Sequence, residues 1–136
     1  MALVGLDLHE ESILSGYAID SAGLGLHHVV SQSLVRVLGL VHAETNAAML
    51  PHVIEALIPR AGKQMTAFAR ALGVKQAELV DRVTELGGGA RRLSKLGAER
   101  ERLGEVVRVI LDRPELRTTP DVPGEAQIRE LISRAW

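Results

Sequence analysis

The chain of 136 residues contains no cysteine and only three aromatic side chains, one each of Phe, Tyr and Trp. The lack of cysteine excludes disulfides, thiolate zinc sites and cysteine nucleophiles. Hydrophobic residues nevertheless make up 46% of the chain, which is the composition of a folded protein rather than a disordered one. Because aromatics are so scarce, the hydrophobic core has to be built from aliphatic side chains.

An excess of charge of either sign is also missing, since the formal net charge is −1 and acidic and basic residues are interspersed. A nucleic-acid partner requires a basic face, so we expect none here. No apolar run reaches the ~18–20 residues that span a bilayer, and residues 1–8 do not read as a signal peptide. The sequence therefore predicts a cytoplasmic protein without membrane contact, folded as a single domain over residues 1–136.

Helical periodicity dominates the rest of the pattern. Aliphatic side chains recur at spacings of three and four over residues 65–72, 80–86, 103–111 and 128–135, whereas strand-like alternation is scarce. Gly73 and Gly87 follow the first two of these segments, where helices commonly end. We predict an all-α fold of about six or seven helices, with the irregular stretch 113–126 before the last one.

Pro51 interrupts an otherwise helical run over residues 44–57. Proline has no N–H, so the Ala47 carbonyl loses its usual partner four residues later. The sequence predicts a kink or a restart of the helix at this point.

Histidines supply the main candidate site. His27 and His28 are adjacent, and His42 follows fourteen residues after His28. On a helix, His28 and Gln32 share a face, whereas His27 points about 100° away from His28. Gly39 allows a turn between them and His42, which we place just ahead of a second helix begun by Glu44 and Thr45.

Two interpretations of these histidines remain open from spacing alone. Converging imidazoles can form a metal or catalytic site, or they can be buried and hydrogen-bonded in a tight helix pair. A hydrolytic zinc needs roughly three protein ligands, and only two histidines here fit. Asp7 and His9, which are two residues apart, would point in opposite directions on a helix and are interpreted as part of a solvated helix start.

Several stretches resemble a known family. They are "GLGLHH" at 23–28, "HAETN" at 42–46 and "LPHV" at 50–53, together with "ILSG" at 13–16 and the tail "IRELISRAW" at 128–136. They are similar to the C-terminal all-α domain of iron-containing alcohol dehydrogenases, with its dehydroquinate synthase-like fold, and most closely to maleylacetate reductases. The resemblance covers nearly the whole chain in register, without large gaps.

The resemblance implies an active site divided between two domains. An N-terminal Rossmann-like domain holds the nicotinamide cofactor, and the helical domain supplies the metal and substrate side. In metal-bearing members, an Asp and a His on an earlier helix join two later histidines, which fall on His28 and His42 here. Gln32 replaces a further histidine near the nicotinamide and substrate. Asn46 fits the broader family, whereas maleylacetate reductases tend to have His at that position.

The chain departs from this pattern in two ways that affect cofactors. On this resemblance, we expect the sequence to begin after the segment that would carry the first two metal ligands, and to lack the cofactor domain. We expect no cofactor to be bound by this chain alone. A divalent metal held by His28 and His42 is doubtful, because two neutral imidazoles leave the ion mostly water-coordinated.

Three functions remain open at this point. In the first, the chain is the helical lobe of a maleylacetate-reductase-like oxidoreductase, docked through an exposed apolar face to a Rossmann-type partner chain that holds NAD(P)H. In the second, a stand-alone domain binds or transforms a small carboxylate or carbonyl compound without a cofactor. Its acid/base groups would be His27, His28 and His42, with Gln32 and Asn46 orienting the ligand. In the third, the chain is a structural module that forms a homo-oligomer.

Overall fold

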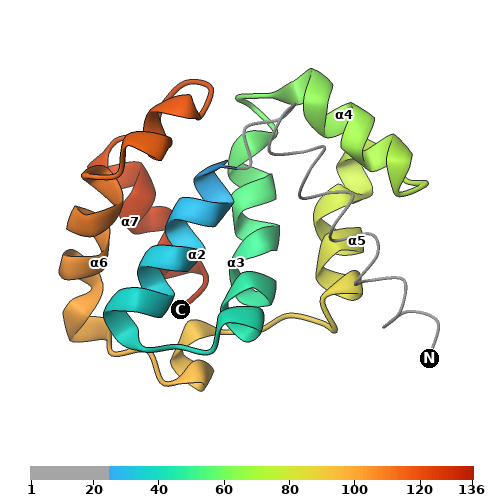
Figure 1. The fold of residues 1–136 in the computed structure, drawn as a ribbon. Helices are drawn as coiled ribbons and strands as arrows, with labels where there is room; N and C mark the ends of the chain where they lie inside the picture. Colours follow the sequence, from blue (N-terminus) through green and yellow to red (C-terminus); the bar gives the residue numbers. More distant parts are fainter. Residues whose placement is uncertain (1–24) are drawn as a thin grey trace.

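We describe residues 25–136 of the protein from a computed structural model (Figure 1). The six α-helices of this part are α2 (Gly25–Leu38), α3 (His42–Leu57), α4 (Gly62–Ala71), α5 (Leu79–Leu86), α6 (Leu103–Leu111) and α7 (Glu125–Arg134). Four short 3-10 helices join them: η1 (Gln76–Glu78), η2 (Leu93–Leu96), η3 (Arg100–Arg102) and η4 (Pro114–Thr118). No strand occurs between residues 25 and 136, and the predicted all-α class is confirmed.

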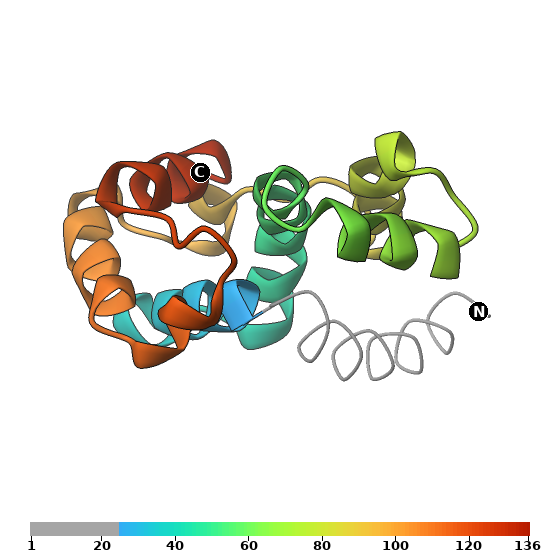
Figure 2. The same cartoon turned by 90° about the horizontal axis from the view of Figure 1, so that it is seen from above.

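The helices form a bundle with a side arm. Helix α2 packs against α3, α6 and η4, and α7 closes the bundle against α3 and α6. Helices α4 and α5 lie on the opposite side of α3 from α6, and α5 packs on α3 (Figures 1 and 2). Helix α3 therefore belongs to both the bundle and the side arm. Its N-terminal end follows the end of α2 after a short turn.

The core is aliphatic, as the composition predicts. Its largest fully buried side chains include residues from α2, α3, α6 and α7, namely Leu26, Leu34, Met49, Ile54, Leu57, Ile110, Ile128 and Ile132. Phe68 of α4 and the terminal Trp136 are the aromatic side chains buried among the described residues. The apolar spacing seen in the sequence thus marks the inner face of each helix.

Two glycines end helices where the sequence places their ends. Gly39 has φ +68° and its N–H donates to the Val35 carbonyl at the end of α2. Gly73 has φ +76° after α4, and the following Val74 N–H donates back to the Ala69 carbonyl. Glycine has no Cβ, so it adopts this left-handed conformation at little cost. The turn at Gly39 brings α3 back beside α2 after only three residues.

The start of α3 differs from the prediction. The helix begins at His42 with Val41 at the N-cap, rather than at Glu44 and Thr45. Thr45 does not cap the helix; its hydroxyl donates to the Val41 carbonyl at 2.8 Å. His42 is therefore part of the helix, and its position is set by the helical geometry rather than by the preceding turn.

Proline has less effect on α3 than expected. The helix continues through Pro51 to Leu57 without the restart that the sequence allowed. Met49, Val53 and Ile54 on either side are completely buried, and this packing holds both halves of the helix in place. The stretch 113–126, predicted to be irregular, contains the 3-10 helix η4.

The end of α7 is tied to η2. The Leu93 N–H donates to the Ala135 carbonyl at 2.8 Å, and the Ser94 hydroxyl donates to the Trp136 carbonyl at 2.7 Å. The Arg100 guanidinium lies 5.7 Å from the centre of the Trp136 ring, within range of a cation–π contact. These contacts join two segments about forty residues apart and hold residues 135 and 136 against η2.

Candidate functional site

The outer face of α2 carries the first half of the candidate site. His28 is exposed and Gln32 is half-buried, one helical turn further along, as their spacing predicts. His27 is half-buried on the neighbouring side, where its Nδ1 lies 3.5 Å from the hydroxyl of the buried Ser31. The two adjacent histidines thus occupy different environments: one ring faces solvent and the other packs against its own helix.

The first turn of α3 carries the second half. His42 is exposed, and the Asn46 side-chain amide donates to His42 Nε2 at 3.2 Å. An amide nitrogen is only a donor, so this ring nitrogen accepts and carries a lone pair rather than a proton. Asn46 thereby orients the His42 ring through a contact within one turn of the same helix.

His28 and His42 both lie within electrostatic range of His27. The pKa of His27 is lowered from 6.5 to about 4, first by burial and then by the charges that His28 and His42 acquire when protonated. At neutral pH the His27 ring is therefore uncharged and is not a proton donor of the imidazolium type. His28 and His42 are the more exposed of the three rings.

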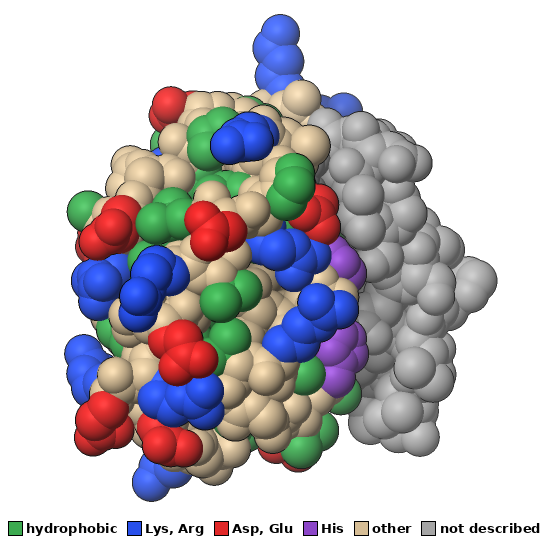
Figure 3. Space-filling model, turned by 60° about the vertical axis from the view of Figure 1, so that its left-hand side comes forward, with side chains coloured by type: hydrophobic (Ala, Val, Ile, Leu, Met, Phe, Trp, Pro, Cys, Tyr) green, Lys and Arg blue, Asp and Glu red, His purple; other side chains and the backbone are tan. Residues whose placement is uncertain are grey.

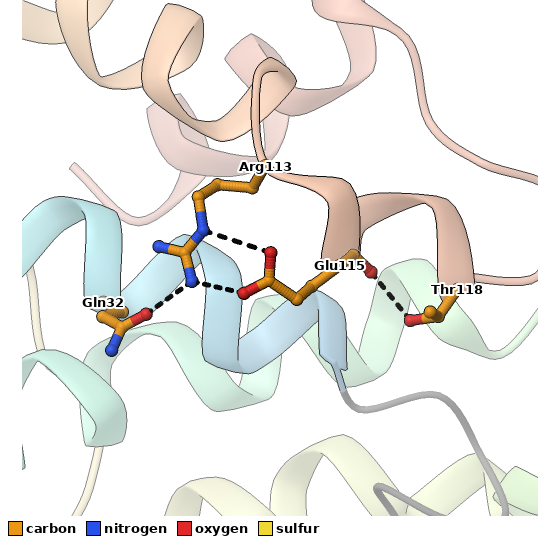
Figure 4. A network of polar contacts seen from close by, with 4 residues as sticks. All are labelled: Gln32, Arg113, Glu115 and Thr118. Atoms are coloured by element: carbon orange, nitrogen blue, oxygen red, sulfur yellow. Dashed lines mark hydrogen bonds and ion pairs between the residues drawn. The ribbon is translucent and has the colours of Figure 1, made fainter.

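Arg113 and Glu115, near the start of η4, were not among the predicted residues. Arg113 Nη2 donates to Gln32 Oε1 at 2.7 Å and to Glu115 Oε2 at 2.7 Å, and Arg113 Nε donates to Glu115 Oε1 at 3.3 Å (Figure 4). These hydrogen bonds from Arg113 lower the pKa of Glu115 to about 2, and nearby His28 adds a smaller effect in the same direction. No spacing rule links residues 81 positions apart, so this network could not be predicted from the pattern of residues along the chain.

A metal is implied by the resemblance, and the described residues do not complete a site for one. Among residues 25–136, no group of three or more His, Cys, Asp or Glu side chains is arranged to hold a metal. His42 Nε2 is already engaged by Asn46. The predicted segment around Asp7 and His9 lies outside the described residues.

The surface near the site is mostly polar. Histidine side chains lie beside Lys and Arg side chains at one edge of the described surface (Figure 3). Among residues 25–136, the large hydrophobic side chains that are exposed are Val41 and Val122. The described residues thus contribute little to the broad apolar docking face predicted from the sequence. The same part of the chain holds no helix with the length and apolar character needed to cross a membrane.

Comparisons with known proteins identify the family of the chain. Residues 4–136 match the model of the Fe-containing alcohol dehydrogenase family, C-terminal. The chain belongs to this family. It is 31% identical to the 1-propanol dehydrogenase PduQ of Salmonella typhimurium over an alignment 143 positions long. This alignment covers 92% of the chain and 39% of that protein. It is 37% identical to the maleylacetate reductase of Burkholderia cepacia over 90 residues, 65% of the chain and 25% of the relative.

A solved structure shows the same fold. The maleylacetate reductase of Agrobacterium tumefaciens superimposes with a TM-score of 0.68 at 28% identity, over 82% of this chain and 31% of that one. The resemblance to this branch of the family, predicted from the histidine motifs, is confirmed. The chain spans about two fifths of the length of the first relatives it matches, and it therefore corresponds to only part of each of those proteins.

Proposed function

We propose that this chain is the helical, substrate-facing lobe of a maleylacetate-reductase-like oxidoreductase, and that a dinucleotide-binding partner completes the active site. Its membership of the family supports this proposal. The observation that carries it is the packing of α2, which bears His28 and Gln32, against α3, which bears His42 and Asn46. These are the positions at which the family resemblance locates the substrate side of the cleft.

In this proposal the partner would hold NAD(P)H, which would supply hydride to the carbonyl carbon of an aldehyde such as propanal or to the conjugated double bond of maleylacetate; in both cases negative charge develops on the carbonyl oxygen. The residues of this chain act on the carbonyl oxygen. The Gln32 amide nitrogen donates a hydrogen bond to that oxygen, which stabilises the negative charge that develops on it. The exposed His28 ring supplies the proton that completes the reduced product. His27, uncharged at neutral pH, shields this side of the site without taking part in proton transfer.

The test is to purify the protein from its native host and to assay NAD(P)H-dependent reduction of maleylacetate and of propanal. We expect a dinucleotide-binding domain to accompany the chain and His28→Ala to lower kcat at least 100-fold. Arg36→Gln, a change at an exposed position one turn beyond Gln32 on α2, is the matched control and should retain activity. A preparation that contains no such domain and reduces neither substrate would refute the proposal.

A second candidate is a stand-alone domain that uses acid/base chemistry without a cofactor. It is favoured by the fact that the three histidines and the Asn46–His42 contact form within this chain alone. In that case the purified chain binds or converts a small carboxylate or carbonyl compound in the absence of NAD(P)H. Loss of this activity in both His28→Ala and His42→Ala would support it, and unchanged activity in both would exclude it.

A further inference from the structure

We propose that Arg113 is a positioning residue that holds the Gln32 amide so that its nitrogen faces a carbonyl or carboxylate oxygen of the substrate. The inference rests on the proposed function for the presence of substrate at this face of α2. It adds a residue from a distant part of the chain and specifies which end of the Gln32 amide is used.

The contact between the two side chains determines the orientation of the amide. Arg113 Nη2 lies 2.7 Å from Gln32 Oε1. A guanidinium group only donates, so the amide oxygen has to face it. A flipped amide would oppose N–H groups with N–H groups. Gln32 Nε2 therefore points away from Arg113, and it has no hydrogen-bond partner among residues 25–136.

Arg113 is itself held in place. Glu115 binds its guanidinium through both carboxylate oxygens, and the Arg113 side chain is only 19% exposed. The Thr118 hydroxyl donates to the Glu115 carbonyl at 2.7 Å, which fixes the turn of η4 that carries the carboxylate (Figure 4). A chain of hydrogen bonds thus runs from Thr118 through Glu115 and Arg113 to the Gln32 amide oxygen. A bidentate contact between Arg and a carboxylate is geometrically specific, so little freedom remains for the amide.

The orientation determines which ligands fit. An amide N–H pair donates to oxygen, so carbonyl and carboxylate compounds are favoured and ammonium compounds are not. A carboxylate oxygen accepts a stronger hydrogen bond than a neutral carbonyl oxygen, so ligands that carry a carboxylate are favoured among these. The oriented amide is therefore suited to ligands that present a carboxylate or carbonyl oxygen.

A purely structural role for Arg113 gives different expectations. If the contact with Gln32 serves only to anchor η4 on α2, changing Arg113 lowers stability and leaves ligand affinity unchanged. A measurement of binding at the Gln32 amide separates the two roles, because the side-chain amide signals in an NMR spectrum report on Gln32 itself.

The probe is levulinate, a stable oxo acid, titrated into the full chain with 2-pentanone as its uncharged counterpart. We expect levulinate to shift the Gln32 amide signals and to bind about tenfold more weakly to Arg113→Gln, as the loss of one oriented hydrogen bond implies. Arg108→Gln on α6 removes the same charge at an exposed position and should leave the affinity unchanged. We expect 2-pentanone to bind more weakly than levulinate.

Gln32→Glu is a second variant, which tests the inference even if Arg113→Gln fails to fold. A glutamate at this position still accepts from Arg113 but has no N–H to offer, so the protein should fold and lose levulinate binding. Unchanged affinity in both Arg113→Gln and Gln32→Glu overturns the inference and leaves the proposed function standing. If levulinate does not shift the Gln32 signals of the unaltered chain, the inference and the proposed substrate face fail together.

Discussion

The two halves of the candidate site are held in different ways. On α2, Gln32 is fixed by Arg113, a residue that lies 81 positions later in the chain. On α3, the His42 ring is fixed by Asn46, four residues away on the same helix. One half therefore depends on the packing of α2 against η4, and the other depends only on the integrity of one helical turn.

This difference indicates how the two halves respond to change. A substitution that disturbs tertiary packing near α2 reaches Gln32, because its partner belongs to another element. The same disturbance leaves the His42–Asn46 contact in place as long as the first turn of α3 persists. The α2 half is thus sensitive to the rest of the bundle, and the α3 half is autonomous.

The largest expected effect comes from removing the packing that anchors α2. Leu34 is completely buried on its inner face, so Leu34→Ala should lower the free energy of unfolding by about 3 kcal/mol, through lost burial and the cavity that remains. Urea denaturation measures this loss. Leu38→Ala, at a partly exposed leucine of the same helix, is the control and should cost less than half as much.

The same variant tests the comparison directly. In Leu34→Ala, NMR signals of the Gln32 side-chain amide should broaden or shift more than those of Asn46. Equal perturbation of both amides would show that the two halves of the site are coupled, contrary to the comparison.

Acidification gives the next largest effect, through His27. Its pKa is about 4 in the folded protein and near 6.5 when unfolded, so the unfolded state binds more protons between these values. Stability contributed by the uncharged ring is therefore present above pH 6.5 and is lost as the pH falls towards 4. The shift corresponds to about 3 kcal/mol.

Urea denaturation between pH 7 and pH 4 compares the unaltered chain with His27→Gln, which retains a hydrogen-bonding side chain beside the Ser31 hydroxyl. The variant should lose less stability over this range. Glu115 also destabilises the fold when protonated, since its folded pKa is lowered to about 2, but it does so in both proteins and cancels in the difference. Identical pH profiles would contradict the assignment of His27 as the ring that stays uncharged in the folded protein.

The smallest effect is expected on α3. Asn46→Ala removes the contact with His42, but it should change the free energy of unfolding by less than about 0.5 kcal/mol, because the lost surface contact is offset by the higher helix propensity of alanine. The His42 ring nitrogen signals should change in NMR spectra, while the Gln32 amide signals stay as they are. A shift at Gln32 would show that the α3 half is not autonomous.

Sequence reasoning succeeded where local chemistry decides the structure. The apolar spacing identified the inner faces of α4 to α7, and Gly39 and Gly73 marked helix ends, because each depends on residues within a turn or two. The same holds for the shared face of His28 and Gln32. The start of α3 was misplaced, because Thr45 has two uses on a helix, and here its hydroxyl bonds back to the Val41 carbonyl instead of capping.

Arg113 was out of reach for a different reason. Its partners belong to α2 and to its own 3-10 turn, and they meet only because α2 packs against η4. The segment around it contains three prolines and no helical period, so the sequence suggested an irregular connection. A contact that is created by tertiary packing leaves no trace in the spacing of residues along the chain.

The place of α2 within the bundle also has a consequence for biosynthesis. Its neighbour α3 leaves the ribosome directly after it, but α6 and η4 follow only when α4 and α5 have been made. At ~5–20 residues per second, the apolar side of α2 that later meets α6 stays uncovered for seconds. Nascent chains of this protein should therefore rely on chaperones most strongly in the interval between the synthesis of α3 and that of α6.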